Sequence, residues 1–522
     1  MKVNFLRLSL LFRFGNKIKF YFVFRSLIRN FGYHRNYFRS GIKRKIVFPF
    51  VFRSLIRNFA ANKQYMDMKR IFLYALLLGG LSTAYAQTGI TPEVLKTLQG
   101  SYTGTPAEKA MRNAISNVGI SKMAVNQENA GAKDKNFSIE VKNTGITDQK
   151  SSGRCWLFTG LNVLRGRAMK KLDTKNLVLS QCHLFFYDQL EKSNLFLQGV
   201  IDTRKQPIDS EMVRWLFQHP LSDGGTYTGV ADLATKYGVI PADIMPETYV
   251  SNSTSEFCGH LKRKLREFGI TLREKSEAGM GEKQLQALKV EQLGTVYRML
   301  VMAYGIPPTQ FTWKGKTYTP QEFFKAYCIN EGEDLNRDYV MLMNDPSRPY
   351  NKVYEIDYDR HVYDGHNWLY VNLPIEELEE IAIASLKDSC QMYFSCDVGK
   401  FLDRNVGFAD INNYDYGSLL GTTFGMNKKQ RIETFDSGST HAMTLMAVDL
   451  DDAGKARKWK VENSWGADSG QNGYIIMTDE WFREYMFRVV VNRRYCPASV
   501  LELMKQKPVR LPAWDPMFQG EE

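Results

Sequence analysis

The chain has 522 residues, of which 44% are apolar and 24% are charged, with 39 Gly and 17 Pro. This composition is typical of a globular protein of about three domains, and it excludes a wholly disordered, collagen-like or multi-span membrane chain. The net charge is +13, but residues 1–86 hold 17 Lys and Arg and one acid, Asp67, whereas the other 436 residues hold 52 basic and 55 acidic residues. The body of the protein therefore gives no electrostatic support for nucleic-acid binding.

Residues 1–65 contain no Asp or Glu and carry the sequence FVFRSLIRNF twice, at 22–31 and at 50–59. Neither a helical nor a strand period runs through this segment. A basic aromatic segment can lie on an anionic membrane surface. The alternative is that it is upstream sequence translated from a start codon placed too early. We favour this alternative, because a second N-terminal signal follows.

Residues 66–86 have the layout of a secretory signal peptide. Lys69 and Arg70 are followed by an apolar run at 71–81 and by the small-x-small sequence Ala84-Tyr85-Ala86. The apolar run is too short to span a bilayer as a stable helix, and no Cys follows the cleavage site for lipid attachment. The sequence therefore predicts export to the periplasm or the extracellular space with no stable membrane anchor. Without this signal, the protein would be cytoplasmic.

The seven cysteines all follow residue 86, so an exported protein retains at least one free thiol. Their spacing contains no CxxC and no zinc-like Cys/His pairing, so the sequence predicts no metal site. We expect most of them to be small buried apolar side chains. They are Cys155, Cys182, Cys258, Cys328, Cys390, Cys396 and Cys496.

Helical and strand patterns are segregated along the rest of the chain. Residues 87–131 are polar and rich in small side chains, which indicates an arm with short helices. Helical periods then occur at 161–187, 209–218, 228–237 and 284–304. Short apolar or alternating runs, typical of strands, occur at 441–448, 457–465 and 474–477. A helical front and a strand-rich back predict an α+β fold.

The candidate nucleophile lies in the sequence QKSSGRCW, residues 149–156. A Ser-Ser-Gly turn precedes Cys155, and a helical apolar pattern follows it at Leu157, Leu161, Leu164 and Ala168. Cys155 is therefore predicted to open a helix, where the helix dipole favours the thiolate. Gln149 can donate its side-chain amide to an oxyanion beside the Cys155 N–H. The alternative is a buried helical Cys with an incidental Gln nearby.

Two later segments supply the partners that a cysteine nucleophile needs. His441 begins a predicted strand, and the alternation of WKVENSW places Asn463 and Trp465 on one face. An imidazole activates the thiol, and an acceptor must orient that imidazole. Asn463 can do so without adding a buried charge, and Trp465 can screen the hydrogen bond from water. Cys155, His441 and Asn463 are thus the candidate catalytic residues.

These segments resemble papain-fold cysteine peptidases and, among them, the bleomycin hydrolase / aminopeptidase C family. The family's motif QxSSGRCW corresponds to residues 149–156, THAM to 440–443, and VENSWG to 461–466. Trp156 and Trp465 take supporting positions in these motifs. Further similarity includes Asp223-Gly224-Gly225, Gly473-Tyr474 and DEWF at 479–482, and the resemblance extends from about residue 110.

The resemblance implies a papain-like α+β fold, with a helical half, an antiparallel β half and a large, mainly helical insertion. His441 follows Cys155 by 286 residues, whereas about 130–150 separate the two in papain relatives. The expected organisation is upstream sequence at 1–65, a signal peptide at 66–86 and a peptidase at 87–522. Within the peptidase, the expected parts are an arm to about 135, the nucleophile-bearing half at 136–240, the insertion at 241–385, the His/Asn-bearing half at 386–500 and a tail at 501–522.

The same resemblance implies a cysteine-type aminopeptidase that acts on peptides without a cofactor and assembles as a homohexamer. It also implies that the tail fills part of the cleft, with Glu522 limiting cleavage to N-terminal residues. The two prolines at 512 and 516 predict an extended tail, and Trp514 is expected to anchor it. The signal peptide and the acidic final residues depart from the family pattern. A papain-like endopeptidase with an open cleft, or a non-catalytic exported interaction protein, are the alternatives.

The signal peptide makes a prediction about the mature chain. Because the small-x-small site ends at Ala86, the exported protein should begin at Gln87. N-terminal sequencing or intact-mass analysis of protein purified from its native host tests this. Any residue of 1–65 on the mature protein would contradict both the late start and the signal peptide.

Overall fold

The computed structural model describes residues 89–129, 134–142 and 145–517. The upstream sequence, the signal peptide and Glu522 lie outside these residues. The chain divides into two units at Gly104 and Thr105. In the first unit, α3 (Pro92–Gly100) starts at a Thr91 cap and buries none of its residues. The second unit begins with the short helices α4 (Pro106–Ile115) and α5 (Ile120–Met123), so the prediction of short helices in this part of the chain is confirmed.

The helical half begins with two long helices where the sequence pattern indicated one. α6 (Cys155–Leu172) ends at Asp173, which has a left-handed φ of 46°. α7 (Gln181–Asp202) starts where the Ser180 hydroxyl accepts a hydrogen bond from the His183 N–H. The expectation of one helical stretch over 161–187 is therefore wrong, because a left-handed cap ends the first helix and a new side-chain cap begins the second.

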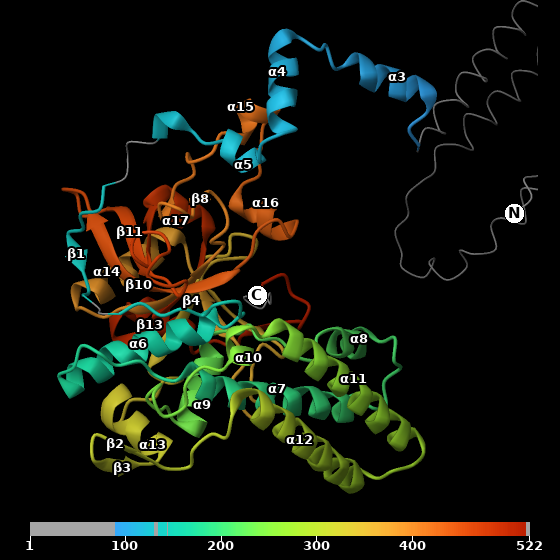
Figure 1. The fold of residues 1–522 in the computed structure, drawn as a ribbon, viewed down its shortest axis with the longest axis vertical. Helices are drawn as coiled ribbons and strands as arrows, with labels where there is room; N and C mark the ends of the chain where they lie inside the picture. The colour runs from blue at the N-terminus through green and yellow to red at the C-terminus, as the bar shows by residue number, and fades with distance from the viewer. Residues whose placement is uncertain (1–88, 130–133, 143–144, 518–522) are drawn as a thin grey trace, which may run out of the picture. The chain divides into compact units, whose positions relative to one another are not determined.

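α8, α9 and α12 lie close to their predicted positions, whereas no helical period was singled out for the long helix α11. α11 and α12 pack against α7 and against each other, which Figure 1 shows in green to yellow-green. A small antiparallel hairpin follows α12. The bounds are α8 (Glu211–Gln218), α9 (Tyr227–Tyr237), α10 (Tyr249–Asn252), α11 (Ser255–Glu277), α12 (Glu282–Tyr304), β2 (Phe311–Trp313), β3 (Lys316–Tyr318), α13 (Pro320–Phe323) and the π-helical η2 (Phe324–Cys328).

A mixed sheet forms the other half, in the order β14-β5-β6-β4-β13-β7-β10-β11-β12-β9-β8, with β1 paired to β10. The segment 241–385 contains long helices and also β4, β5 and β6, which belong to this sheet. The strands are β1 (Ile139–Glu140), β4 (Tyr339–Met343), β5 (Lys352–Ile356), β6 (Leu369–Asn372), β7 (Met392–Cys396), β8 (Leu402–Asp403), β9 (Phe408–Ala409), β10 (His441–Leu450), β11 (Ala456–Glu462), β12 (Tyr474–Thr478), β13 (Met486–Asn492) and β14 (Val509–Leu511).

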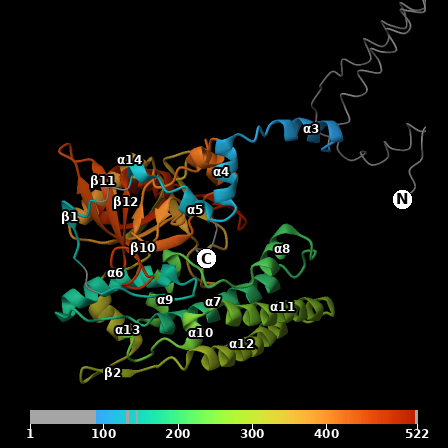
Figure 2. The same cartoon turned by 45° about the horizontal axis from the view of Figure 1, so that its top comes forward.

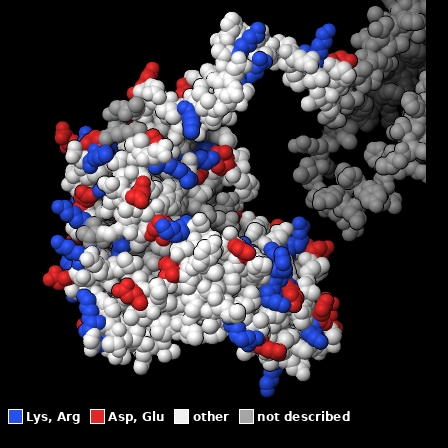
Figure 3. All heavy atoms as spheres, viewed as in Figure 1, with Lys and Arg blue, Asp and Glu red and all other residues white. Residues whose placement is uncertain are grey.

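Shorter helices surround the sheet, and the two views in Figures 1 and 2 show the sheet beside the helical half. They are η1 (Gln127–Asn129), α14 (Ile375–Lys387), α15 (Tyr416–Leu420), α16 (Lys428–Glu433), α17 (Asp479–Tyr485), η3 (Arg493–Tyr495) and α18 (Ala498–Leu503). The predicted α+β class is confirmed. Basic and acidic side chains are interspersed on the face shown in Figure 3. No helix in the described ranges is both long and apolar enough to cross a membrane.

Strand β10 lies between the two hydrophobic cores. Its first nine residues are all buried. Ala442 packs in the core on the helical side, whereas Met443 and Leu445 pack in the core on the other face of the sheet. A strand covered on both faces shows a continuous apolar run instead of alternation, which explains the apolar sequence at 441–448. Helix α6 packs directly on this strand.

A buried ion pair joins the two halves beside this contact. The Arg165 Nη2 of α6 lies 2.7 Å from the Glu462 Oε1 of β11, with 1% and 0% of the two side chains exposed. The same nitrogen donates to the carbonyl of Gly145 at 3.0 Å. Neither residue was singled out from the sequence.

Glu462→Ala should lower the free energy of unfolding by about 3–5 kcal/mol, because it leaves the Arg165 guanidinium buried without a counter-charge. Urea unfolding followed by circular dichroism measures this. The double variant Arg165→Met/Glu462→Leu removes both charges and should recover most of the loss. A Glu462→Ala protein within about 1 kcal/mol of the parent would contradict this account of the pair.

Candidate active site

The turn before α6 fixes the position of the candidate nucleophile. The Gln149 Nε2 donates to the Ser152 carbonyl, and the Ser152 hydroxyl donates to the Gln149 carbonyl, both at 2.6 Å. α6 begins at Cys155, as predicted, and no acidic residue lies in its first turn. The thiol is therefore at the positive end of an 18-residue helix, where the dipole favours the thiolate. Cys155 is buried.

His441 and Asn463 meet as the sequence predicted. His441 is the first residue of β10, and its Nε2 lies 2.7 Å from the Asn463 Oδ1. That oxygen also accepts a hydrogen bond from the Ser464 N–H at 2.8 Å. Because the oxygen is an acceptor in both contacts, the Nε2 carries the proton and the Nδ1 is left with its lone pair.

Burial controls the charge of His441. Its pKa is lowered to about 4, mainly by burial and to a smaller extent by the charge of Arg404, while the Asn463 hydrogen bond acts in the opposite direction. The imidazole is therefore neutral at neutral pH and able to accept a proton from a thiol.

Trp465 covers this pair. Its ring centroid lies 4.9 Å from that of His441, with 31° between the planes. The guanidinium of Arg404 lies over the same indole, 4.9 Å from the ring centroid. The geometry agrees with the expectation that Trp465 limits the access of water to the hydrogen bond.

Gln149 connects the nucleophile's turn to the segment that carries Asn463. Its backbone N–H donates to the Ser464 carbonyl at 2.8 Å, and its Oε1 accepts a hydrogen bond from the Ser464 hydroxyl at 2.6 Å. Its Nε2 carries two hydrogens, and the Ser152 carbonyl takes one of them. Among the residues that the structure describes, the Ser152 carbonyl is the one acceptor of this amide.

Asp223 was not identified as a site residue from the sequence, yet it holds the nucleophile's loop. Its Oδ2 accepts a hydrogen bond from the Gly153 N–H at 2.8 Å and another from the Thr254 hydroxyl. Its carbonyl accepts one from the Trp156 Nε1 at 2.9 Å. The only signal in the sequence was the Asp-Gly-Gly motif of the family resemblance.

A buried charged network lies behind Trp156. The ring of His361 packs edge-on against Trp156 at 4.5 Å, and its Nδ1 lies 2.5 Å from the Asp188 Oδ1. The Lys192 Nζ lies 3.0 Å from the other Asp188 oxygen. Burial alone would raise the pKa of Asp188, but Lys192 and His361 hold it below its ordinary value. Asp188 and Lys192 lie four residues apart on α7, whereas Trp156 and His361 come from distant segments, so no single local pattern indicates the network.

The tail is fastened by residues other than the expected anchor. Trp514 is 43% exposed, so it does not serve as the buried anchor that the sequence suggested. Instead, the Asp515 Oδ2 lies 2.5 Å from the Arg348 Nη2, and the Met517 carbonyl accepts a hydrogen bond from the buried Arg488 at 2.6 Å. The tail is extended where β14 pairs in parallel with β5, but the segment with the two prolines is not extended: it forms turns, and the Asp515 N–H donates to the Pro512 carbonyl at 3.0 Å.

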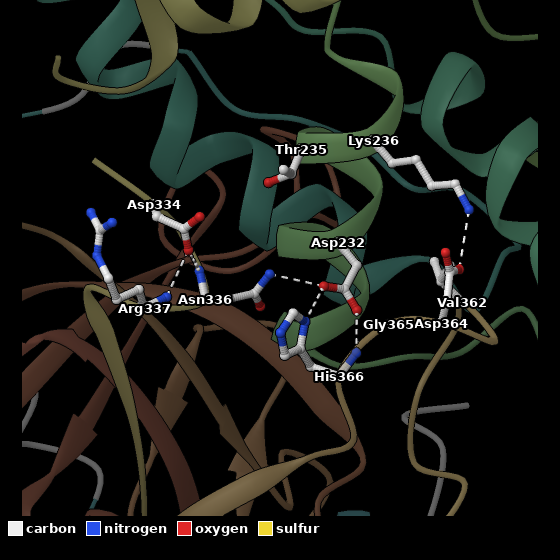
Figure 4. Close-up of a pocket in the computed structure, with 10 residues that line it drawn as sticks. All are labelled: Asp232, Thr235, Lys236, Asp334, Asn336, Arg337, Val362, Asp364, Gly365 and His366. Carbon is white, nitrogen blue, oxygen red and sulfur yellow. Dashed lines mark hydrogen bonds and ion pairs between the residues drawn. The ribbon is translucent and has the colours of Figure 1, made fainter. Parts of the chain in front are cut away.

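A cavity of about 500 Å³ lies apart from the candidate catalytic residues, none of which lines it. Figure 4 shows Asp232 at its centre, held by His366 and Asn336. The Asp232 carboxylate accepts hydrogen bonds from the His366 N–H, the His366 ring and the Asn336 amide at 2.7–2.8 Å. Among the described residues, no group of three or more His, Cys, Asp or Glu is arranged to hold a metal ion.

The structure agrees with the expectation that most cysteines are small buried side chains. None of the seven is in a disulfide, and all except the half-buried Cys390 are buried. Burial raises the pKa of Cys182, Cys258, Cys328 and Cys496 to about 12.

The chain is similar to known proteins over most of its length. The family model described as "Peptidase C1-like family" matches residues 89–518. Human bleomycin hydrolase is 41% identical over 390 residues, which cover 71% of this chain and 85% of the relative. Aminopeptidase W of Lactobacillus delbrueckii subsp. lactis is 36% identical over 439 residues, which cover 82% and 99%. The crystal structure of PepW from Lactobacillus rhamnosis HN001 matches with a TM-score of 0.78 and 37% identity, over 83% and 99% of the two chains.

These matches confirm the resemblance that the motifs indicated and the papain-like fold. The helix that opens with a thiol and the buried His–Asn pair lie within the matched region. The chain therefore belongs to the Peptidase C1-like family and is a cysteine-type peptidase.

Proposed function

We propose that the protein is a cysteine-type aminopeptidase that removes residues from the N-terminal end of peptides, with Cys155 as the nucleophile. The observation that carries the N-terminal specificity is the anchoring of the Met517 carbonyl by Arg488, which lies on β13, two strands from His441. The similarity to bleomycin hydrolase and aminopeptidase W supports the same reading.

The proposed mechanism uses the groups described above. The His441 Nδ1 takes the proton of Cys155, and the thiolate attacks the carbonyl of the first peptide bond. Gln149 and the Cys155 N–H stabilise the oxyanion. His441 then gives its proton to the leaving amine, and water hydrolyses the thioester. Asn463 keeps the imidazole oriented through both proton transfers.

The strand register supports a role for the tail at the cleft. Arg488, which holds the Met517 carbonyl, lies opposite Ser395, and Ser395 lies opposite Ala442, the neighbour of His441. Two strand spacings amount to about 10 Å. The five residues after Met517 can span up to about 17 Å. The acidic side chains at 521 and 522 are therefore within reach of the cleft.

A carboxylate in the cleft gives a physical reason for N-terminal cleavage. It attracts the protonated amine of a substrate, and the tail occupies the space that a longer chain would need. Asp515 and Arg348 keep the tail in place, and the pKa of Arg348 is raised although burial alone would lower it, because Tyr370, Asp515 and Asp345 favour its charge.

Export and assembly are further parts of the proposal. The layout of residues 66–86 supports export, and the family resemblance supports a homo-oligomer.

The mechanism predicts the effect of removing each reacting group. Cys155→Ser and His441→Ala should each lower kcat/KM by about two to four orders of magnitude. Asn463→Ala should have a smaller effect, because it orients the imidazole and does not react. Hydrolysis of an aminoacyl p-nitroanilide measures all three. Cys390→Ser is the matched control, since its thiol is half-buried and outside the site. Appreciable turnover by Cys155→Ser would eliminate the thiol mechanism.

The tail should determine the choice between free and blocked N-termini. Deleting residues 518–522 should raise the ratio of cleavage of N-acetylated to free peptides about tenfold or more, because both the charge and the obstruction are removed. Glu521→Gln/Glu522→Gln isolates the charge and should weaken only the preference for a free amine.

Glu502→Gln, an exposed acid on α18, is the control for a lost charge. Mass spectrometry of the products gives the ratio, and light scattering on the same samples reports whether each variant keeps the mass of the parent. An unchanged ratio after deletion would show that the tail is structural and that the aminopeptidase assignment is wrong or rests on another feature.

A further inference from the structure

Arg404 stands at the tip of a hairpin that is built onto the site. It follows β8, and the Asp403 side chain accepts hydrogen bonds from the N–H groups of Asn405 and Val406 at 3.2 Å. Gly407 has a φ of +66°, and a Cβ there would lie 2.6 Å from the Gln471 nitrogen. The hairpin tip is therefore closely packed on the segment around Gln471.

That segment is the one that carries Asn463 and Trp465. The Gln471 side chain donates to the Val406 carbonyl at 2.5 Å. The Gly473 carbonyl accepts a hydrogen bond from the Asn463 N–H at 3.0 Å. The backbone of Arg404 is thus fixed with respect to the catalytic His–Asn pair.

The side chain of Arg404 extends this arrangement into a row of three groups. Its guanidinium lies over Trp465, and Trp465 lies over His441, each 4.9 Å from the next. The positive charge of Arg404 acts electrostatically on the imidazole and contributes to the lowered pKa of His441. Arg404 is exposed, and it forms no ion pair with any residue that the structure describes. The guanidinium of Arg404 is therefore a positioned positive charge whose N–H groups can donate hydrogen bonds to a ligand.

In the proposed reaction, the leaving part of the substrate lies next to Arg404, Trp465 and His441. His441 must give its proton to the leaving amine, so the peptide beyond the cleaved bond runs beside the imidazole and its cover. We propose that Arg404 binds a carboxylate on the leaving part of the substrate and so favours short peptides or acidic leaving residues. This inference rests on the proposed aminopeptidase function. A guanidinium suits this role because it pairs with a carboxylate through two parallel hydrogen bonds while it stacks on an aromatic ring.

Three peptides with the same N-terminal residue distinguish the sources of the carboxylate. Leu-Gly carries only the terminal carboxylate, Leu-Glu-NH2 carries only a side-chain carboxylate, and Leu-Gly-NH2 carries neither. The parent should cleave one or both of the acidic peptides with a higher kcat/KM than Leu-Gly-NH2. Arg404→Gln should lower kcat/KM for the preferred acidic peptide by roughly fivefold to tenfold. It should leave Leu-Gly-NH2 within about twofold.

Two further variants, and measurements at low and high ionic strength, complete the test. Arg404→Lys keeps the charge without the planar fork and should fall between the parent and Arg404→Gln. Arg263→Gln removes an exposed arginine from α11 and should change none of the three rates. The preference for the acidic peptide should decrease between low and high ionic strength in the parent only.

The outcomes separate this inference from the function on which it rests. If Arg404→Gln changes the three rates equally, or changes none, recognition of a carboxylate is overturned while the aminopeptidase function stands. If the parent cleaves none of the three peptides, although N-acetylated longer peptides are cleaved, both the aminopeptidase function and this inference are overturned.

Discussion

Helix α6 lies directly against strand β10, and the candidate site depends on this contact. The helix brings the thiol at its first residue, and the strand brings the imidazole at its first residue. Both ends must lie at the same edge of the interface for the two groups to react. The ion pair of Arg165 and Glu462 and the hydrogen bonds between Gln149 and Ser464 cross the same interface. The register between the two halves is therefore fixed at several points.

Burial provides the electrostatic character of the site. The imidazole is neutral because it is desolvated, while the thiol faces the positive end of a helix. A neutral imidazole can accept a proton from a thiol whose ionisation a helix dipole favours. Charged groups nearby are paired or placed at the edge: Asp188 is matched by Lys192, and Arg404 lies outside the indole that covers His441. Of these charges, that of Arg404 contributes to the low pKa of His441.

Local sequence patterns predicted the parts of the site that local geometry determines. The helix that opens at Cys155, the strand that opens at His441 and the pairing of His441 with Asn463 were all evident from motifs and periods. The roles of these residues in catalysis remain predictions. The break between α6 and α7 was missed, because a cap at Asp173 interrupts an apolar pattern that continues on both sides.

Contacts between distant segments were not predictable in this way. Glu462 is 297 residues from Arg165, and His361 is 173 from Asp188. The sequence around each of these four residues does not indicate its partner, because a single sequence does not distinguish a buried charged residue from one on the surface. The anchors of the tail were missed for the same reason. Trp514 was the conspicuous side chain, whereas Met517 is the buried one.

The position of β10 has a consequence for synthesis of the chain. The nucleophile-bearing helix emerges from the ribosome long before β10, because 286 residues separate Cys155 from His441. The central pairings of β7, β10 and β13 also require the last third of the chain. Such distant pairings form late and slowly in folding. A growing chain therefore carries the thiol of α6 before the imidazole of β10 has been synthesised.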